Sequence, residues 1–274
     1  MNQEENLDSE IQNGMITNSL ITIDIENCTR CGACVDACPA RLYYIQDDEL
    51  KLARYFEDYC IECGHCTAIC PVKVIKLNIH EDKTLIDTKE IQDIPSFQHF
   101  HNLVRKRRSI RQYKEEAVPK EKINKLLEIA NYSPTASNTE NVYFSVVKDK
   151  KTVSKISRTI TKQVSQMIEL AGSEKGRELL KSSLSQNAYE MAIENAPKSR
   201  RILKVIEQGT DFWCWNAPAL IIIHGDREIG GISVNCSLAG GYIMLAAETI
   251  GLVTCSLGYL TYFVNQIKKL RTIL

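Results

Sequence analysis

The sequence predicts a chain of mixed helices and strands in two parts, a small cysteine-rich unit with short strands and a larger unit of helices and strands. Two closely spaced cysteine runs lie between residues 28 and 70, and short alternating apolar segments flank them. Helical periodicity and two strand-like apolar segments follow beyond residue 119. The 274 residues are 44% hydrophobic and 25% charged, which is a globular composition with enough apolar material for a sizeable core.

The charge of the chain is balanced, with 34 Lys and Arg against 34 Asp and Glu. No overall field therefore draws the chain to nucleic acid or to a membrane surface, and we expect neither partner. Residues Met1–Glu5 have neither the basic start nor the apolar core of a secretory signal. We therefore predict a cytoplasmic location, where thiols stay reduced and a disulfide framework is not expected.

Most of the 11 cysteines fall in two runs of identical spacing, C-x2-C-x2-C-x3-C followed by proline. The runs are Cys28, Cys31, Cys34 and Cys38, then Cys60, Cys63, Cys66 and Cys70. Paired C-x2-C is also a zinc spacing, but zinc has no use for the third cysteine or for the proline. An iron–sulfur cubane needs three thiolates on one tight loop and a fourth from a distance. The spacing favours such clusters over zinc or purely structural cysteines.

Over roughly residues 16–80 the chain resembles the bacterial two-cluster ferredoxins, in which the fourth cysteine of each run serves the other cluster. The resemblance implies a ferredoxin-like βαββαβ domain with two 4Fe–4S clusters. It assigns one cluster to Cys28, Cys31, Cys34 and Cys70 and the other to Cys60, Cys63, Cys66 and Cys38. Gly32 and Gly64 stand where the backbone passes close to the cluster sulfides, which a missing side chain permits.

Alternating apolar residues predict a short strand on either side of the cysteine runs. They are Ile21, Ile23 and Ile25 before the runs and Ile75, Leu77 and Ile79 after them. So few apolar residues do not hold a small domain together alone, and the clusters are expected to supply the missing stability.

Residues 80–97 contain Pro95, many charges and little periodicity, which is typical of a linker. We place the boundary near Asp93, so that residues 1–93 form the cluster domain with its linker and residues 94–274 form the second domain. A basic run over residues 105–111 opens the second domain. Arginine forks and a hydroxyl suit a phosphate, so we favour a local anion site. A solvated face and a nucleic-acid patch over residues 105–114 are the other interpretations.

Elements of the second domain follow from periodicity. The spacing of Ile123, Leu126 and Ala130 predicts a helix between Pro119 and Ser133. Two apolar runs, 142–147 and 219–224, predict buried strands, and the composition of 150–210 is helical. Between residues 229 and 267 only Glu248 is charged, but frequent glycine, serine and threonine argue against a membrane span. We expect a buried helix over 235–250, with Gly251 at its C-terminal cap.

Three segments resemble the nitroreductase family of flavoproteins over about residues 97–270. They are RRSIRQY, SPTASNTENV and, after the long apolar helix, IGLVTCSLG. The resemblance implies an α+β fold with a central, mainly antiparallel sheet. It also implies an intertwined homodimer that binds FMN at the subunit interface.

The same resemblance implies the flavin contacts. Arg107, Arg108 and Ser109 match the segment that holds the phosphate and ribityl chain. Arg111 matches a basic position at the carbonyl edge of the ring, where a cation stabilises the negative charge of reduced flavin. A second segment closes on the flavin from the other subunit, and a late loop lines the isoalloxazine. These two are Pro134, Thr135, Ala136, Ser137 and Asn138, and then Thr254, Cys255, Ser256, Leu257 and Gly258.

The chain departs from the family pattern at several positions. Glu140 stands where glutamine is frequent, and Val253 and Ser256 replace a common glycine and a common aromatic residue. Family members usually continue through a final strand and a basic tail, whereas this sequence is expected to finish with a helix over residues 266–274. The remaining cysteines are expected to be small buried hydrophobic residues: Cys214, Cys236 and Cys255.

Two clusters beside a flavin predict an electron-transfer oxidoreductase, because clusters move single electrons and FMN collects two. The expected donor is a reduced ferredoxin, a flavodoxin or NAD(P)H. The expected acceptor is a nitroaromatic, a quinone or an activated alkene. The alternative is a ferredoxin-type electron carrier or redox sensor whose flavin domain serves mainly for dimerisation.

Overall fold

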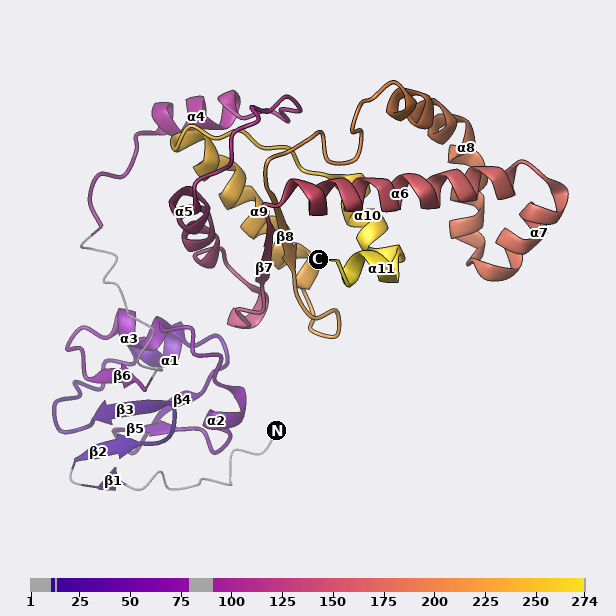
Figure 1. Cartoon of the computed structure of the whole chain (residues 1–274). Coiled ribbons are helices and arrows are strands. Elements are labelled where there is room, and N and C mark those ends of the chain that lie inside the picture. Colours follow the sequence, from indigo (N-terminus) through magenta and orange to yellow (C-terminus); the bar gives the residue numbers. More distant parts are fainter. Residues whose placement is uncertain (1–10, 13, 79–90, 274) are drawn as a thin grey trace. The chain divides into compact units, whose positions relative to one another are not determined.

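The computed structural model describes residues 11–12, 14–78 and 91–273 (Figure 1). The chain divides into two compact units: residues 1–95 with 136–139, and residues 96–135 with 140–274. Predictions that concern Met1–Glu5, Ile79, residues 80–90 and Leu274 lie outside the described residues.

The first unit contains two small antiparallel sheets, with strand orders β1-β2-β3-β6 and β4-β5. From β3 onward its elements follow the predicted βαββαβ order, with the short helix α2 added and a hairpin, β1–β2, in front. The bounds are β1 Ile11–Gln12, β2 Met15–Thr17, β3 Ile21–Asp24, α1 Ala33–Ala37, β4 Tyr43–Gln46, β5 Glu49–Leu52, α2 Phe56–Tyr59, α3 His65–Ile69 and β6 Ile75–Leu77.

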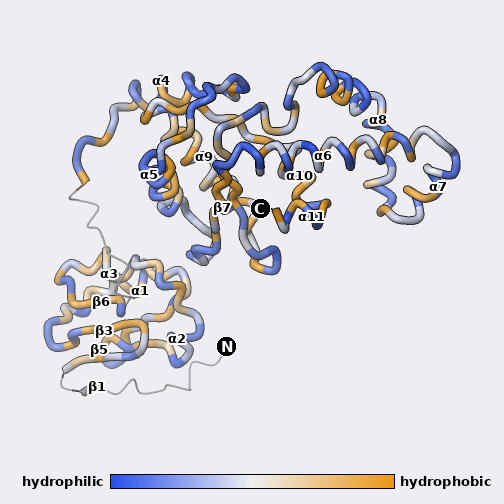
Figure 2. Tube along the Cα trace, in the orientation of Figure 1, coloured by the Kyte–Doolittle hydropathy of each residue, from blue (hydrophilic) through white to orange (hydrophobic). Residues whose placement is uncertain are grey.

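The core of the first unit lies between these sheets and the cysteine loops. Ile21 is paired with Leu77 and Ile23 with Ile75, and all four side chains are buried. The predicted alternation is therefore confirmed along β3 and β6, although β3 ends at Asp24. Figure 2 shows β3 among the hydrophobic segments of this unit. Two thiols, those of Cys34 and Cys66, belong to the same buried cluster.

The second unit combines helices with one two-stranded sheet, which confirms the α+β class. The helical composition predicted for residues 150–210 corresponds to three helices, α6 to α8. The bounds are α4 Phe97–Lys106, α5 Lys120–Asn131, β7 Tyr143–Val147, α6 Lys150–Ala171, α7 Glu174–Ser183, α8 Gln186–Glu207, β8 Leu220–His224, α9 Ile232–Thr249, α10 Gly258–Gln266 and α11 Lys268–Arg271.

The sheet of the second unit is covered on both faces. β7 and β8 are antiparallel, with Phe144 opposite Ile223 and Val147 opposite Leu220. Phe144 and Ile223 pack on the cluster formed by α5 and α9, whereas Val147 and Leu220 belong to the larger core. A sheet buried on both faces needs apolar residues at successive positions, which explains why neither segment alternates. Both predicted strands are confirmed.

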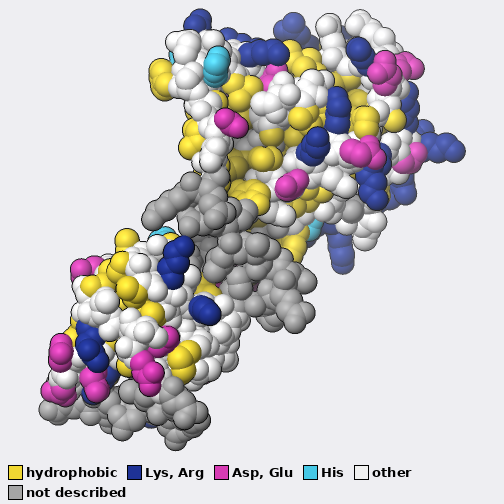
Figure 3. All heavy atoms as spheres, turned by 90° about the vertical axis from the view of Figure 1, so that its left-hand side faces the viewer, with side chains coloured by type: hydrophobic (Ala, Val, Ile, Leu, Met, Phe, Trp, Pro, Cys, Tyr) yellow, Lys and Arg dark blue, Asp and Glu magenta, His cyan; other side chains and the backbone are white. Residues whose placement is uncertain are grey.

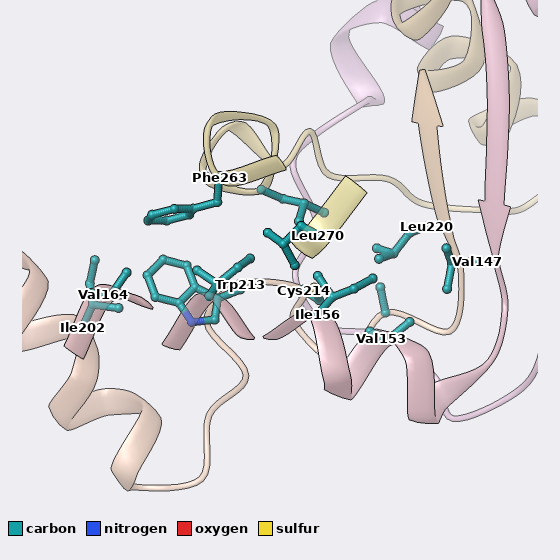
Figure 4. Packing of buried hydrophobic residues seen from close by; sticks show 13 residues of the cluster. Val147, Val153, Ile156, Val164, Ile202, Trp213, Cys214, Leu220, Phe263 and Leu270 are labelled. Carbon is teal, nitrogen blue, oxygen red and sulfur yellow. The ribbon is translucent and has the colours of Figure 1, made fainter. Parts of the chain in front are cut away.

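The larger core is built around one face of α6 (Figure 4). Val153, Ile156 and Ile160 of that helix are buried against Trp213 and Leu270. The Trp213 indole Nε1–H donates to Thr161 Oγ1 at 2.8 Å, so its polar edge is satisfied inside the core. α6 is thus a structural part of the core as well as a surface helix.

The helix α9 packs closely on α5 through small residues. Ala239 and Ala247 are fully buried in the cluster that also contains Leu126 and Ala130 of α5. Among the described residues, no helix has the length and apolar composition needed to span a bilayer. The helix predicted for this region is confirmed, but it is buried along one face only, which contains Asn235, Ala239, Ile243 and Ala247.

The sequence predicted the C-terminal end of α9 better than its start. The helix begins at Ile232, earlier than the predicted residue 235, because Gly231 starts it with a left-handed backbone and no side-chain cap marks the position. It ends at Thr249, and Gly251 has a φ of 70°, as the predicted glycine cap requires.

Hydrophobic side chains remain exposed on the second unit (Figure 3). Several lie at helical spacing on α9 and on the neighbouring helix α4: Val234, Leu238, Tyr242, Phe97, Phe100 and Val104.

The predicted final helix over residues 266–274 is wrong in extent. The helix α10 begins at Gly258, and Ile267 breaks the helical path with an extended backbone before the short helix α11. The break brings Leu270 into the core, where it is fully buried. Among the other cysteines, Cys214 is fully buried as predicted. Cys236 and Cys255 are only half-buried, so the predicted burial is wrong for these two.

Candidate functional site

The two cysteine loops have the same local structure. Gly32 and Gly64 adopt left-handed backbone angles, with φ of 75° and 74°, immediately before α1 and α3. A residue with a Cβ is strained in this conformation, so glycine lets each loop turn sharply into its helix. Each helix carries the third cysteine of its run, and the fourth cysteine, Cys38 or Cys70, forms its C-terminal cap.

The eight cysteines of the two runs line two cavities in two sets of four. The first set is Cys28, Cys31, Cys34 and Cys70. The second set is Cys38, Cys60, Cys63 and Cys66. The fourth cysteine of each run therefore lies with the first three of the other run. All eight are free thiols.

The remaining walls of both cavities are mainly apolar. The first cavity includes Leu50, Val74 and Ile75, and the second includes Leu42, Tyr43, Phe56 and Leu77. Such walls limit the access of water and lower the local dielectric, both of which influence a metal cluster.

Burial raises the pKa of two of the eight thiols. It raises the pKa of Cys34 to about 11, with the neighbouring Cys28 adding to the effect. Burial also raises the pKa of Cys60. By contrast, the backbone N–H of Ala33 and the side chain of Thr29 lower the pKa of the exposed Cys31. A buried thiol gives up its proton to become a metal ligand, so metal binding and proton release are coupled.

Backbone groups near the cavities donate to cysteine sulfurs. The N–H of Arg30 lies 3.4 Å from the Sγ of Cys28, and the N–H of Leu42 lies 3.4 Å from the Sγ of Cys38. Hydrogen bonds of this kind stabilise thiolate charge and help to set cluster potentials.

The donor set of each cavity suits a 4Fe–4S cluster. In the described parts of the chain, no three His, Cys, Asp or Glu side chains converge on the position of one metal ion. A cubane is held differently, because each of its four thiolates binds a separate iron atom. Four thiols around an apolar cavity, with backbone donors aimed at sulfur, fit that requirement.

Two of the three predicted flavin segments lie together in the second unit. Ser109 and Thr254 form a parallel bridge, and the N–H of Ile110 donates to the carbonyl oxygen of Thr254 at 3.0 Å. The Thr254 hydroxyl is buried and has no hydrogen-bond partner among the described residues. Arg108 and Arg111 are exposed on the same strand-like segment, and Arg107 is half-buried. Cations beside an open polar group suit an anionic, polar ligand.

Arg111 stacks on a tryptophan. Its guanidinium carbon lies 5.6 Å from the ring centroid of Trp215, within the range of a cation–π contact. The Arg111 Nη1 also donates to the Ser109 carbonyl oxygen at 3.4 Å. The two contacts restrict the position of the predicted flavin cation.

The turn that carries Trp215 is held by Asp211. The carboxylate accepts from the backbone N–H groups of Trp213 and Cys214, at 3.3 and 3.1 Å, and from that of Asn216 at 3.0 Å. Trp215 and Asn216 both have left-handed backbone angles, with φ of 56° and 53°. Such angles are costly for residues other than glycine, and the Asp211 carboxylate supports them.

The third predicted flavin segment, Pro134–Asn138, is a tight turn. Ser137 and Asn138 have φ of 51° and 53°, and the Glu140 N–H donates to the Thr135 hydroxyl oxygen at 3.0 Å. Residues 136–139 group with the first unit. The structure therefore brings together two of the three predicted flavin segments, Arg107–Arg111 and Thr254–Gly258.

Comparison with known protein families identifies both parts of the chain. Residues 104–274 match the model of the nitroreductase family. The chain belongs to the nitroreductase family. Residues 20–71 match a 4Fe-4S dicluster domain, so this member carries a ferredoxin-type domain before its nitroreductase domain.

Several solved structures are similar to this nitroreductase-family chain. A nitroreductase with bound FMN from Bacteroides fragilis is 17% identical, with a TM-score of 0.45, over 64% of this chain and 77% of that chain. A BluB-like flavoprotein from Clostridium difficile is 22% identical, with a TM-score of 0.44, over 62% and 79%. An FMN-dependent nitroreductase from Mycobacterium smegmatis in complex with NADPH is 15% identical, with a TM-score of 0.43, over 64% and 81%. A comparison with curated proteins finds no match.

The family matches confirm the predicted fusion of a dicluster domain with a nitroreductase-like oxidoreductase domain. Sequence reasoning missed Tyr43, Trp215 and Asp211. An aspartate two residues before a turn N–H is a known capping pattern, so Asp211 carried a readable signal. No local signal marks Tyr43 or Trp215, because their neighbours come from distant parts of the chain.

Proposed function

We propose that this chain is an electron-transfer oxidoreductase that binds two 4Fe–4S clusters and FMN and passes electrons from a low-potential donor to a small acceptor. The observation that carries the proposal is the sorting of eight thiols into two sets of four around two apolar cavities. The nitroreductase and dicluster matches support both halves of the proposal.

The cysteine side chains are the ligands of the clusters in this proposal. Cys28, Cys31, Cys34 and Cys70 hold one, and Cys60, Cys63, Cys66 and Cys38 hold the other. Three ligands on one loop fix most of each site, and the fourth ties the two loops together. Because Cys34 and Cys66 are buried among apolar residues, they also keep water from their clusters.

The flavin contacts in this proposal are the three segments predicted from the sequence. Arg107, Arg108 and Ser109 bind the phosphate and the ribityl chain, for which exposed guanidinium forks and a hydroxyl are suited. Residues 134–138 and 254–258 line the ring system. The unpartnered Thr254 hydroxyl supports a polar ligand at this position.

When bound, the clusters carry single electrons and FMN collects two electrons for delivery as hydride. Arg111 provides a fixed positive charge that stabilises negative charge at the edge of the ring. Its stacking on Trp215 holds that charge in place before the reaction, so little reorganisation is needed.

The proposed assembly is a homodimer formed through the second unit. Val234, Leu238 and Tyr242 are exposed at successive turns of α9, and an apolar stripe of this kind favours burial against a partner. The proposed donors are reduced ferredoxin, flavodoxin or NAD(P)H, and the acceptor is a nitroaromatic, quinone or activated alkene. The free thiols suit a reducing compartment such as the cytoplasm.

The proposal is tested with full-length protein purified without air. We expect about eight iron atoms and one FMN per chain, since two cubanes need four irons each. Stopped-flow absorption then follows cluster and flavin bands after mixing with reduced ferredoxin or NAD(P)H. Cluster bleaching followed by flavin reduction, with turnover of a nitroaromatic, supports the oxidoreductase. Iron without flavin at saturating FMN supports the electron carrier or sensor instead, and reduction of flavin with unchanged clusters removes the proposed electron path.

A further inference from the structure

Tyr43 places an unsatisfied polar group in the second cysteine cavity. The residue is 3% exposed and lines the cavity formed by Cys38, Cys60, Cys63 and Cys66. Its hydroxyl is buried and makes no hydrogen bond to a nitrogen or oxygen atom of the described residues. Buried hydroxyls are normally paired, because an unpaired one loses its hydrogen bonds to water without replacement. The position of this hydroxyl therefore points to the cysteine sulfurs around the cavity as its partners.

The ring of Tyr43 has little freedom to turn elsewhere. Its strand, β4, pairs with β5 so that Tyr43 lies opposite Leu52. Phe56 contacts the ring edge-on, with centroids 5.4 Å apart and an interplanar angle of 84°. The backbone and the ring are thus fixed from two sides, and the residue lines the cavity of the four thiols.

Cys66 is the thiol most closely connected with this hydroxyl. Of the four cysteines that line this cavity, Cys66 is the one that is buried, and it belongs to the same buried cluster as Tyr43. A tyrosine hydroxyl is ordinarily protonated at neutral pH and can donate one hydrogen bond. A thiolate that holds a cluster is an anionic acceptor, which makes such a bond stronger than one between neutral groups.

We propose that Tyr43 donates an O–H···S hydrogen bond to the cluster-bound thiolate of Cys66 and thereby raises the reduction potential of that cluster relative to the other, an inference that rests on the proposed cluster ligation. The bond stabilises the more negative, reduced state more than the oxidised state, so it favours reduction. Among the described residues that line the first cavity there is no tyrosine. The hydroxyl therefore distinguishes two sites whose four-cysteine ligand sets are alike.

The test compares Tyr43→Phe with wild-type protein, both as full chains with clusters assembled without air. The substitution removes one oxygen atom and keeps the ring that packs on Phe56. Redox titration followed by electron paramagnetic resonance measures both cluster potentials. For the cluster bound by Cys66, we expect the equilibrium constant for reduction to fall about tenfold, which lowers the potential of a one-electron couple by ~59 mV. The potential of the other cluster is expected to change much less. Tyr44→Phe is the matched control, because Tyr44 is the next residue of β4 and faces the opposite side of the strand; its potentials are expected to equal those of the wild type.

Three other outcomes would each contradict a different part of the proposal. If Tyr43→Phe retains full iron with both potentials unchanged, the proposed bond is absent. If it loses half its iron, Tyr43 is needed for assembly and the tuning role is wrong. If the wild-type chain itself assembles no cluster, the proposed function fails before Tyr43 is tested.

Discussion

Asp211 holds the turn that contains both tryptophans of the chain, and its substitution tests how that turn is supported. One carboxylate oxygen accepts from the Ser157 hydroxyl at 2.6 Å and from the N–H groups of Trp213 and Cys214 at 3.3 and 3.1 Å. The other accepts from the Asn216 N–H at 3.0 Å. Asp211→Ala leaves three backbone donors and a hydroxyl without this acceptor.

The expected loss follows from these four bonds. A hydrogen bond to a charged group contributes about 1.5 kcal/mol at the low end, which gives about 6 kcal/mol for independent bonds. The four share one carboxylate that is only half-buried, and water replaces part of the network. We therefore expect Asp211→Ala to lower the free energy of unfolding by about 3 kcal/mol. Asp211→Asn keeps one acceptor oxygen but turns an NH₂ toward the Asn216 N–H, and we expect a loss of about 1 kcal/mol.

Urea unfolding followed by tryptophan fluorescence measures this loss directly, because Trp213 and Trp215 are the two tryptophans of the chain. Circular dichroism in parallel reports the helices. Asp226→Ala is the matched control, since that carboxylate accepts from the Glu228 N–H at 3.0 Å on an exposed turn. A difference of less than about 0.5 kcal/mol between Asp211→Ala and the control refutes the supporting role of Asp211.

Three further predictions concern the cofactor sites. Cys70→Ser is expected to remove the cluster held by Cys28, Cys31 and Cys34, and Cys38→Ser the cluster held by Cys60, Cys63 and Cys66. Electron paramagnetic resonance of each variant checks this crossed ligation. Loss of the cluster held by the cysteines of the substituted residue's own run contradicts it. Gly64→Ala, at a φ of 74°, is expected to cost about 1–2 kcal/mol of stability in thermal unfolding, whereas Gly241→Ala on α9, which has open space around its Cβ position, is expected to be neutral or stabilising. Arg111→Lys keeps the charge but loses the planar stack, so the dissociation constant for FMN measured by fluorescence is expected to rise about tenfold; unchanged affinity contradicts the proposed contact.

The cysteine unit was the part of the fold most accessible from sequence. Ligand spacing on a tight loop is a local constraint. The cysteine loops and the turns at Gly32 and Gly64 could therefore be predicted without knowledge of distant contacts. The strands β3 and β6 were also readable, because each has one buried face and alternates. The hairpin β1–β2 was not predicted, since its strands are too short to establish a pattern.

The ends of the last helices were less accessible. Ile267 interrupts the path between α10 and α11 without proline or glycine, and the break is explained by the burial of Leu270 in a core formed by distant residues. The start of α9 at Ile232 carries no side-chain cap. In both cases tertiary packing fixes the boundary, and a local pattern contains no signal for it.

The contacts of Tyr43 and Trp215 show the same dependence on distant residues. Trp215 lies next to Arg111 because the Asp211 carboxylate stabilises a turn far along the chain from that arginine. Tyr43 reaches the second cavity because β4 follows the first cysteine run and packs against the loop of the second. The motifs indicate the proposed ligands, whereas the residues that position them are identified only from the fold.

The small apolar content of the first unit is explained by the double role of its thiols. Cys34 and Cys66 are members of the buried core, together with Ile21 and Ile23. Burial raises the pKa of Cys34 to about 11, so in the absence of metal this thiol is neutral at pH 7 and packs as a small hydrophobic residue. In the proposed ligation, metal binding converts these core members into charged ligands whose charge is neutralised by iron. Cluster assembly and the packing of this unit are therefore one coupled equilibrium, in which iron provides stability that so short a chain does not obtain from apolar burial alone.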